Sequence, residues 1–120
     1  MARVLIIDDD AEMRMALERT LKQAGYEVIS AADGNEGLKV CRAGPLDLVI
    51  TDLFMPNKEG METIMELRRD FPKTAIIAMS GASDTALLLT TARLLGAART
   101  LHKPFRPEEL LMAVEEALRG

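Results

Sequence analysis

Four short apolar runs in this chain each end in a charged or hydroxyl-bearing residue, and this pattern limits the possible folds more than any other feature. If each run is a buried parallel strand, the carboxyl ends of the strands lie along one edge of a sheet, where open α/β folds bind ligands. Three carboxylates, one hydroxyl and one ammonium group would then meet in a single cleft. The runs are residues 4–7 before Asp8 and Asp9, 48–51 before Asp52, 75–79 before Ser80, and 100–102 before Lys103.

Helix-like stretches and turn residues separate these runs, which indicates βαβ units and a parallel sheet. With 120 residues, 48% of them apolar, the chain is long enough for one hydrophobic core. We therefore predict a single α/β domain over residues 1–120. The expected strands are 3–8, 27–30, 47–52, 74–79 and 98–101, and the expected helices lie near 13–24, 35–42, 60–71, 84–95 and 107–117.

The composition argues against several classes of function. The net charge is −4, whereas a domain that binds duplex DNA usually carries a basic face, so we expect no direct nucleic-acid contact. No apolar stretch is long enough to cross a bilayer. The single cysteine, Cys41, fits a reducing compartment, and we expect a cytoplasmic protein in which Cys41 is a small apolar helix residue.

The acidic residues at the strand ends suit a divalent cation. Asp8, Asp9 and Asp52 would repel one another at one sheet edge, and a cation removes that conflict. Magnesium prefers oxygen ligands and commonly binds through one or two carboxylates and a phosphate oxygen. Asp52 could also be a nucleophile, because carboxylates form aspartyl-phosphate intermediates. Lys103 and Ser80 would then contact the phosphoryl oxygens.

Four segments together make the chain resemble the receiver domains of two-component response regulators. The resemblance covers the whole chain, and the four segments are highly specific in this order and spacing. It implies a flavodoxin-like three-layer fold with five helices and a five-stranded parallel sheet of order 2-1-3-4-5. The segments are VLIIDDD at 4–10, DLFMP at 52–56 followed by Gly60, MSG at 79–81, and GA at 96–97 followed by KPF at 103–105.

The resemblance also implies roles for the site residues. Asp52 would accept a phosphoryl group from a phosphohistidine on a sensor histidine kinase or phosphotransfer protein. Mg²⁺ would be held by Asp8, Asp9 and Asp52, with Asp9 more direct than Asp8, and by the backbone carbonyl of Phe54.

On the same resemblance, Lys103 would contact the phosphoryl group, and Ser80 would move toward it as the switch. The Lys103–Pro104 peptide bond is expected to be cis. The domain would catalyse only its own phosphotransfer and slow dephosphorylation, so we do not expect a classical enzyme.

Two features affect the expected switch and the lifetime of the phosphoryl group. In the family that the chain resembles, the residue three before the lysine that matches Lys103 is usually an aromatic that changes rotamer with the switch hydroxyl. Here that residue is Thr100. The signal would then travel through backbone shifts around Ser80 and the following loop, or be weaker. Phe54 and Ala82, at positions that tune the lifetime of the acyl phosphate, are both apolar, so we expect slow dephosphorylation.

Two surfaces are candidates for partners. In the helix near 84–95, which Ser83 or Asp84 could cap, Leu87 and Leu94 fall on a flank away from the stripe of Leu88, Ala92 and Leu95. This helix, the strand at 98–101 and the last helix could dock a second copy or an output partner. The resemblance places the kinase or phosphotransfer partner near Met13, Arg14 and Met15. The one histidine, His102, is expected to face solvent.

Other interpretations compete with this one. Asp9 and Asp10 could merely cap the following helix. Asp8 to Asp10 contain the Asp-x-Asp pattern of haloacid dehalogenase phosphohydrolases, although the other acids and the lysine are spaced differently. A flavodoxin would need a phosphate loop after the first strand, where three aspartates would repel flavin phosphate. A degenerate receiver that binds partners without phosphorylation is a further alternative.

Overall fold

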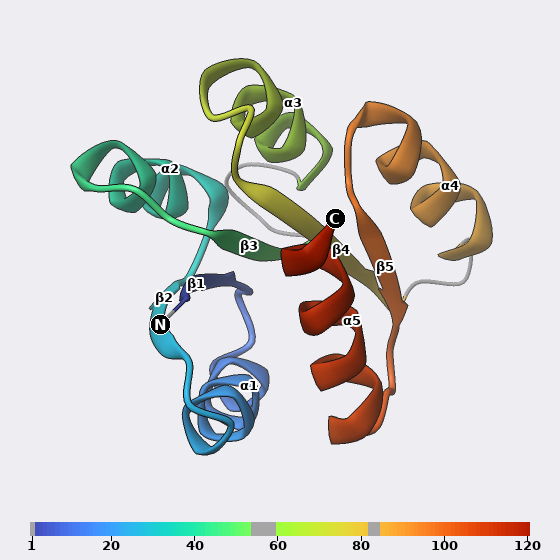
Figure 1. Cartoon of the computed structure of the whole chain (residues 1–120). Helices are drawn as coiled ribbons and strands as arrows, with labels where there is room; N and C mark the ends of the chain where they lie inside the picture. Colours follow the sequence, from blue (N-terminus) through green and yellow to red (C-terminus); the bar gives the residue numbers. More distant parts are fainter. Residues whose placement is uncertain (1, 54–59, 82–84) are drawn as a thin grey trace.

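The computed structural model describes residues 2–53, 60–81 and 85–120, apart from the side chains of residues 85 and 88. One sheet of five parallel strands has the order β2-β1-β3-β4-β5 (Figure 1). The predicted α/β class, flavodoxin-like topology and strand order are confirmed. The strands are β1 Arg3–Ile7, β2 Glu27–Ala31, β3 Leu48–Asp52, β4 Ala75–Ser80 and β5 Arg99–His102, and the helices are α1 Ala11–Gln23, α2 Gly34–Ala43, α3 Gly60–Asp70, α4 Thr85–Leu95 and α5 Pro107–Arg119.

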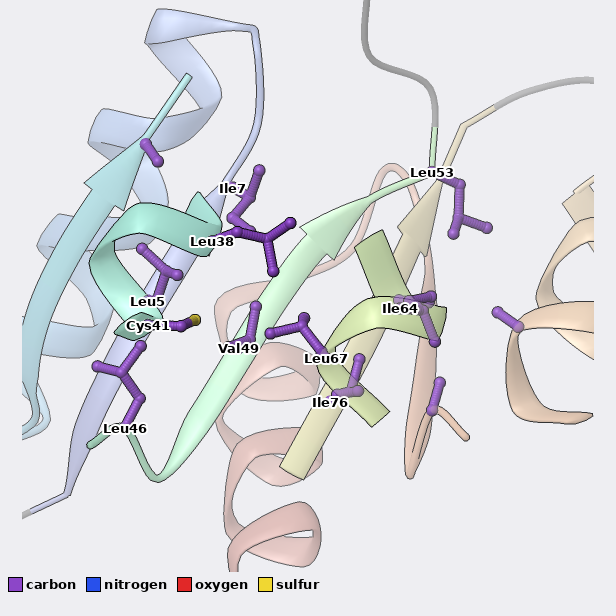
Figure 2. Close-up of a cluster of buried hydrophobic side chains, with 14 residues drawn as sticks. Leu5, Ile7, Leu38, Cys41, Leu46, Val49, Leu53, Ile64, Leu67 and Ile76 are labelled. Atoms are coloured by element: carbon purple, nitrogen blue, oxygen red, sulfur yellow. The ribbon is translucent and has the colours of Figure 1, made fainter. Parts of the chain in front are cut away.

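Two hydrophobic cores lie on opposite faces of the sheet, because successive strand side chains point to opposite sides. In β1, Leu5 and Ile7 belong to one core, and Val4 and Ile6 belong to the other. The first core is covered by α2, α3 and α4 (Figure 2), and the second by α1 and α5. Every residue of β3 is buried, as expected for a central strand covered on both faces.

Several local expectations are confirmed. The Lys103–Pro104 peptide bond is cis. Cys41 is 4% exposed and packs in the first core, as expected for a small apolar helix residue. His102 is exposed. The suggested caps of α4, Ser83 and Asp84, lie outside the described residues.

The start of α1 differs slightly from the predicted position. The helix begins at Ala11, because the Asp10 carboxylate accepts hydrogen bonds from the N–H groups of Glu12 and Met13. Such a cap satisfies backbone donors that the first helical turn cannot pair. Asp10 is therefore the capping residue of this segment.

None of the described helices combines the length and the apolar composition that crossing a bilayer requires.

Candidate functional site

Strand order brings the predicted site residues to one edge of the sheet. Because β3 lies between β1 and β4, Asp52 at the end of β3 is close to both Asp8, which follows β1, and Ser80, which ends β4. Lys103 follows β5, and its backbone N–H donates to the Ser80 carbonyl at 2.9 Å. The carboxyl ends of four strands thus supply one cluster of polar side chains, as the sequence pattern predicts.

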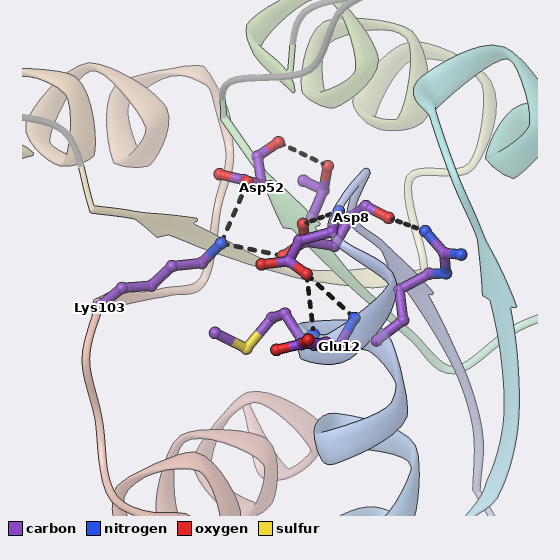
Figure 3. Close-up of polar contacts among 8 residues, drawn as sticks. Asp8, Glu12, Asp52 and Lys103 are labelled. Carbon is purple, nitrogen blue, oxygen red and sulfur yellow. Dashed lines mark hydrogen bonds and ion pairs between the residues drawn. The ribbon is translucent and has the colours of Figure 1, made fainter.

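The Lys103 ammonium joins the two buried carboxylates of this cluster (Figure 3). Its Nζ lies 2.9 Å from Asp8 Oδ2 and 3.1 Å from Asp52 Oδ2. Burial acts to lower the pKa of Lys103, but the hydrogen bond to Asp8 and the negative charges of Asp52 and Asp8 outweigh it and raise the pKa above its ordinary value. The lysine is therefore a permanent cation at neutral pH, aimed at the Asp52 carboxylate.

Asp8 and Asp9 occupy different environments although they are adjacent in sequence. The Asp8 side chain is fully buried, with Oδ1 accepting from the Asp10 N–H at 2.9 Å and Oδ2 bonded to Lys103. Asp9 is exposed. One carboxylate is thus fixed within the protein, and the other faces the solvent from which a cation would arrive.

The three carboxylates could hold a metal ion together. One oxygen from each of Asp8, Asp9 and Asp52 lies within 4.8 Å of the other two. These are hard oxygen donors of the kind that Mg²⁺ prefers. Three carboxylates beside the one ammonium of Lys103 also leave excess negative charge, which a dication would neutralise. The residues present therefore fit Mg²⁺.

Two predicted contributors cannot be placed. The Phe54 carbonyl and the Ala82 side chain lie outside the described residues. Ser80 is placed, and its side chain is fully buried at the end of β4. The Ser80 hydroxyl is therefore enclosed within the protein at the end of β4.

The entry into α3 is packed directly on the end of β3. The Gly60 N–H donates to the Leu53 carbonyl at 3.2 Å. A Cβ atom at Gly60 would lie 2.5 Å from the Leu53 Cα and would also collide with the Asp52 carbonyl oxygen. Glycine is required there because neither backbone neighbour can give way.

The sequence reasoning missed one contact at the site. The Arg14 Nη1 donates to the backbone carbonyl of Asp8 at 2.7 Å, although Arg14 was assigned only to a partner surface. Helix side chains lean toward the N-terminus of their helix. A long donor one turn into α1 could therefore have been expected to reach back toward the end of β1.

Comparison with known proteins identifies close similarities. A family model described as "Response regulator receiver domain" matches residues 4–115. The chain is 40% identical over 119 residues to a probable transcriptional regulator, ycf27, of Porphyridium aerugineum, covering 98% of this chain and 48% of that protein. It is 36% identical over 116 residues to a probable chemotaxis protein CheY of Rhizobium etli, covering 94% of this chain and 89% of that protein.

Solved structures agree with the sequence matches. The response regulator protein TrrA of Thermotoga maritima, in complex with Mg²⁺ and BeF, has a TM-score of 0.87 and 34% identity, with 98% of this chain and all of that chain (100%) covered. The chain spans about half the length of the transcriptional regulators it matches (48% for PhoP of Bacillus subtilis).

Proposed function

This chain belongs to the response regulator receiver domain family of two-component systems, and we propose that Asp52 is its phosphoacceptor. Phosphorylation on an aspartate and Mg²⁺ binding are general features of this family. The observation that carries the assignment is that the Asp52 carboxylate lies together with those of Asp8 and Asp9 and with the Lys103 ammonium. The matched residues, 4–115, support treating 1–120 as one receiver domain.

In the proposed reaction, an Asp52 carboxylate oxygen attacks the phosphorus of a phosphohistidine on a partner. The N–P bond breaks as the O–P bond forms, and the released imidazole nitrogen takes up a proton. Lys103 is positioned to neutralise charge on the phosphoryl oxygens. Asp8, Asp9, Asp52 and the Phe54 carbonyl would hold Mg²⁺, which supplies further charge neutralisation when bound.

The proposed switch uses the Ser80 hydroxyl without an aromatic partner. Ser80 is buried, and Thr100 is half-buried at the equivalent of the aromatic position. Bonding of Ser80 to the phosphoryl group would shift the backbone around it and bias a two-state equilibrium. We also propose slow dephosphorylation, since apolar Phe54 and Ala82 offer no polar side-chain atom to orient a hydrolytic water. A phosphoryl lifetime of only seconds in magnesium buffer would contradict this.

A shallow apolar groove supports a docking place for the phosphohistidine-bearing partner. Met13 and Leu17 of α1 line one side, and Phe105 and Leu110 line the other. The groove adjoins Pro104, the residue after Lys103, so a partner seated there would be near the acidic cluster. Met15, 62% exposed on α1, is not part of the groove lining and stays a separate candidate contact for the partner.

A second proposed surface consists of α4, β5 and α5. Leu87 and Leu94 are 70% and 83% exposed on α4, and Met112 is 61% exposed on α5. Apolar side chains at such exposure favour contact with a second copy or an output partner. The proposed cytoplasmic location agrees with the single, buried Cys41.

Mass spectrometry of the intact protein after incubation with acetyl phosphate, with and without Mg²⁺, tests the phosphoacceptor. We expect one added phosphoryl group only when Mg²⁺ is present, and none in Asp52→Asn. Asp70→Asn is a matched control, because Asp70 ends α3 and pairs with Arg69 instead of the cluster; it should be modified like the wild type. An adduct that persists in Asp52→Asn would reject the assignment, and no adduct in the wild type would favour a degenerate receiver.

A further inference from the structure

Arg14 is connected to the acidic cluster through the backbone. Its guanidinium donates to the Asp8 carbonyl at 2.7 Å across the first turn of α1, and the side chain is half-buried. That carbonyl belongs to the peptide group joining Asp8 to Asp9. The orientation of this peptide group therefore helps to determine where the Asp9 side chain begins.

The other contacts of this turn show what the arginine adds. The Asp8 N–H donates to the Ala31 carbonyl at 3.2 Å, and both carboxylate oxygens of Asp8 are bonded, one to the Asp10 N–H and one to Lys103. Asp8 is thus fixed on its strand side and at its side chain. Arg14 supplies the hydrogen bond to the Asp8 carbonyl, which belongs to the peptide group that leads to the exposed Asp9.

We propose that Arg14 is a positioning residue that orients the Asp8–Asp9 peptide and thereby sets the affinity of the cluster for Mg²⁺. The inference rests on the proposed function of Asp8, Asp9 and Asp52 as a magnesium site. Partners that orient metal ligands from outside the first coordination shell typically change metal affinity by about 10- to 100-fold when removed.

The positive charge of Arg14, acting alone, would change Mg²⁺ affinity in the opposite direction from its orienting role. The two roles can therefore be separated by experiment. A guanidinium beside the cluster repels an incoming dication, so its removal should tighten Mg²⁺ binding if charge alone acts. If orientation of the peptide group dominates, its removal should weaken binding. The sign of the change in affinity therefore separates the two roles.

The test is calorimetric titration of Mg²⁺ into the wild type, Arg14→Lys and Arg14→Gln, with thermal unfolding of each variant as a check on the fold. Arg14→Lys keeps the charge and one donor but lacks the planar fork of the guanidinium. We expect the affinity to fall in the order wild type, Arg14→Lys, Arg14→Gln, with a loss of about tenfold in the last. If Arg14→Gln does not fold, weaker binding by Arg14→Lys than by the wild type is the expected result.

Arg19→Gln is the matched control, because Arg19 is exposed on the same helix and the substitution removes the same charge. It should bind Mg²⁺ at least as tightly as the wild type. Unchanged or tighter binding by the Arg14 variants, or equal weakening in Arg19→Gln, would overturn the role of Arg14. Absence of Mg²⁺ binding by the wild type would instead refute the proposed function on which it rests.

Discussion

At the scale of single residues, the Lys103 ammonium has two opposing effects on the carboxylates of Asp8 and Asp52. Its ammonium is bonded to both Asp8 and Asp52, so it relieves repulsion between them while competing with a cation for the same oxygens. In the proposed function, the same charge would also stabilise a phosphoryl group on Asp52. In the proposed function, a lysine in this position would favour phosphoryl transfer and oppose tight metal binding.

Replacing Lys103 with methionine should separate these effects. We expect Lys103→Met to bind Mg²⁺ more tightly, because the competing ammonium is gone, yet to form little phosphoryl adduct. Without metal, two buried carboxylates lose their counter-charge, which should cost about 3 kcal/mol of unfolding free energy. Calorimetric titration, mass spectrometry and urea unfolding measure the three quantities. Full phosphorylation of Lys103→Met would show that the ammonium is not needed.

The buried Cys41 allows a prediction about thiol chemistry. Burial raises the pKa of the Cys41 thiol to about 11 from 9.0, against smaller opposing effects from the Arg42 charge and a backbone hydrogen bond. The thiolate is the reactive form, so at pH 8 the native protein should contain about a hundredfold less thiolate than the unfolded chain. Reaction with a disulfide reagent should accordingly be at least that much slower without denaturant than with it.

The raised pKa of the Cys41 thiol also determines how the unfolding free energy changes with pH. Because the folded pKa is raised, the protonated thiol favours the folded state fully below about pH 9, and this contribution is lost as the pH rises through about 11. Cys41→Ala should lose less unfolding free energy than the wild type over this pH interval. Equal reactivity of the native and denatured thiol would show that the first core opens readily around Cys41.

At the scale of elements, α4 combines a buried and an exposed apolar surface. Ala92 is fully buried, and Leu89 and Leu95 pack against the first core. Leu87 and Leu94 face away from it, as the helical spacing predicts, with exposed fractions of 70% and 83%. The exposed pair therefore contributes little to folding and is available to a partner.

Replacing both exposed leucines with alanine should leave the fold intact and weaken association. Alanine has the highest helix propensity, so the melting temperature of Leu87→Ala/Leu94→Ala should remain close to that of the wild type. Self-association of the BeF-loaded protein, measured by sedimentation velocity, should fall. Met65→Ala is the control, because Met65 is a 54% exposed methionine on α3, outside the proposed surface. Unchanged association in the double variant would exclude this face.

The helices and strands could be predicted closely because apolar spacing, turn residues and caps agree with the tertiary fold. The strands were found because central strands covered on both faces are apolar throughout, as in β3, and the helix limits were found where glycine, proline or a cap interrupts the pattern. Errors of one or two residues arose where a side chain decides the boundary. The capping interpretation weighed for Asp9 and Asp10 applies only to Asp10, and the spacing of apolar residues alone could not reveal this.

The candidate site could be predicted as a set of residues but not as a set of contacts. Parallel strands bring their carboxyl ends together, so the meeting of Asp8, Asp52, Ser80 and Lys103 follows from the pattern. The bonding of Lys103 to both carboxylates depends on strand register and on the path of the chain after β5. The Arg14 contact depends on the direction of one side chain over the start of α1, which residue type and spacing indicate only weakly.

At the scale of the whole molecule, apolar and charged groups are separated along the strands. The two cores occupy both faces of the sheet, whereas the negative charge of the cluster is concentrated at the carboxyl edge. That concentration opposes folding through repulsion, which a bound cation would relieve. The stability of the entire fold should therefore depend on Mg²⁺, although the site occupies only one edge.

Thermal unfolding with and without Mg²⁺ should reveal this linkage. A ligand that binds only the folded state at a hundred times its dissociation constant stabilises it by about 2.7 kcal/mol, which corresponds to a rise of roughly 10 °C in melting temperature for a domain of this size. Asp9→Asn should lose most of this increment while unfolding normally without metal, because Asp9 is exposed and its loss removes repulsion instead of packing. Asp70→Asn, far from the cluster in sequence and paired with Arg69, should retain the full increment. An equal Mg²⁺-dependent rise in Asp9→Asn and the wild type would mean that the cation stabilises the protein elsewhere, and the acidic cluster would then be rejected as the metal site.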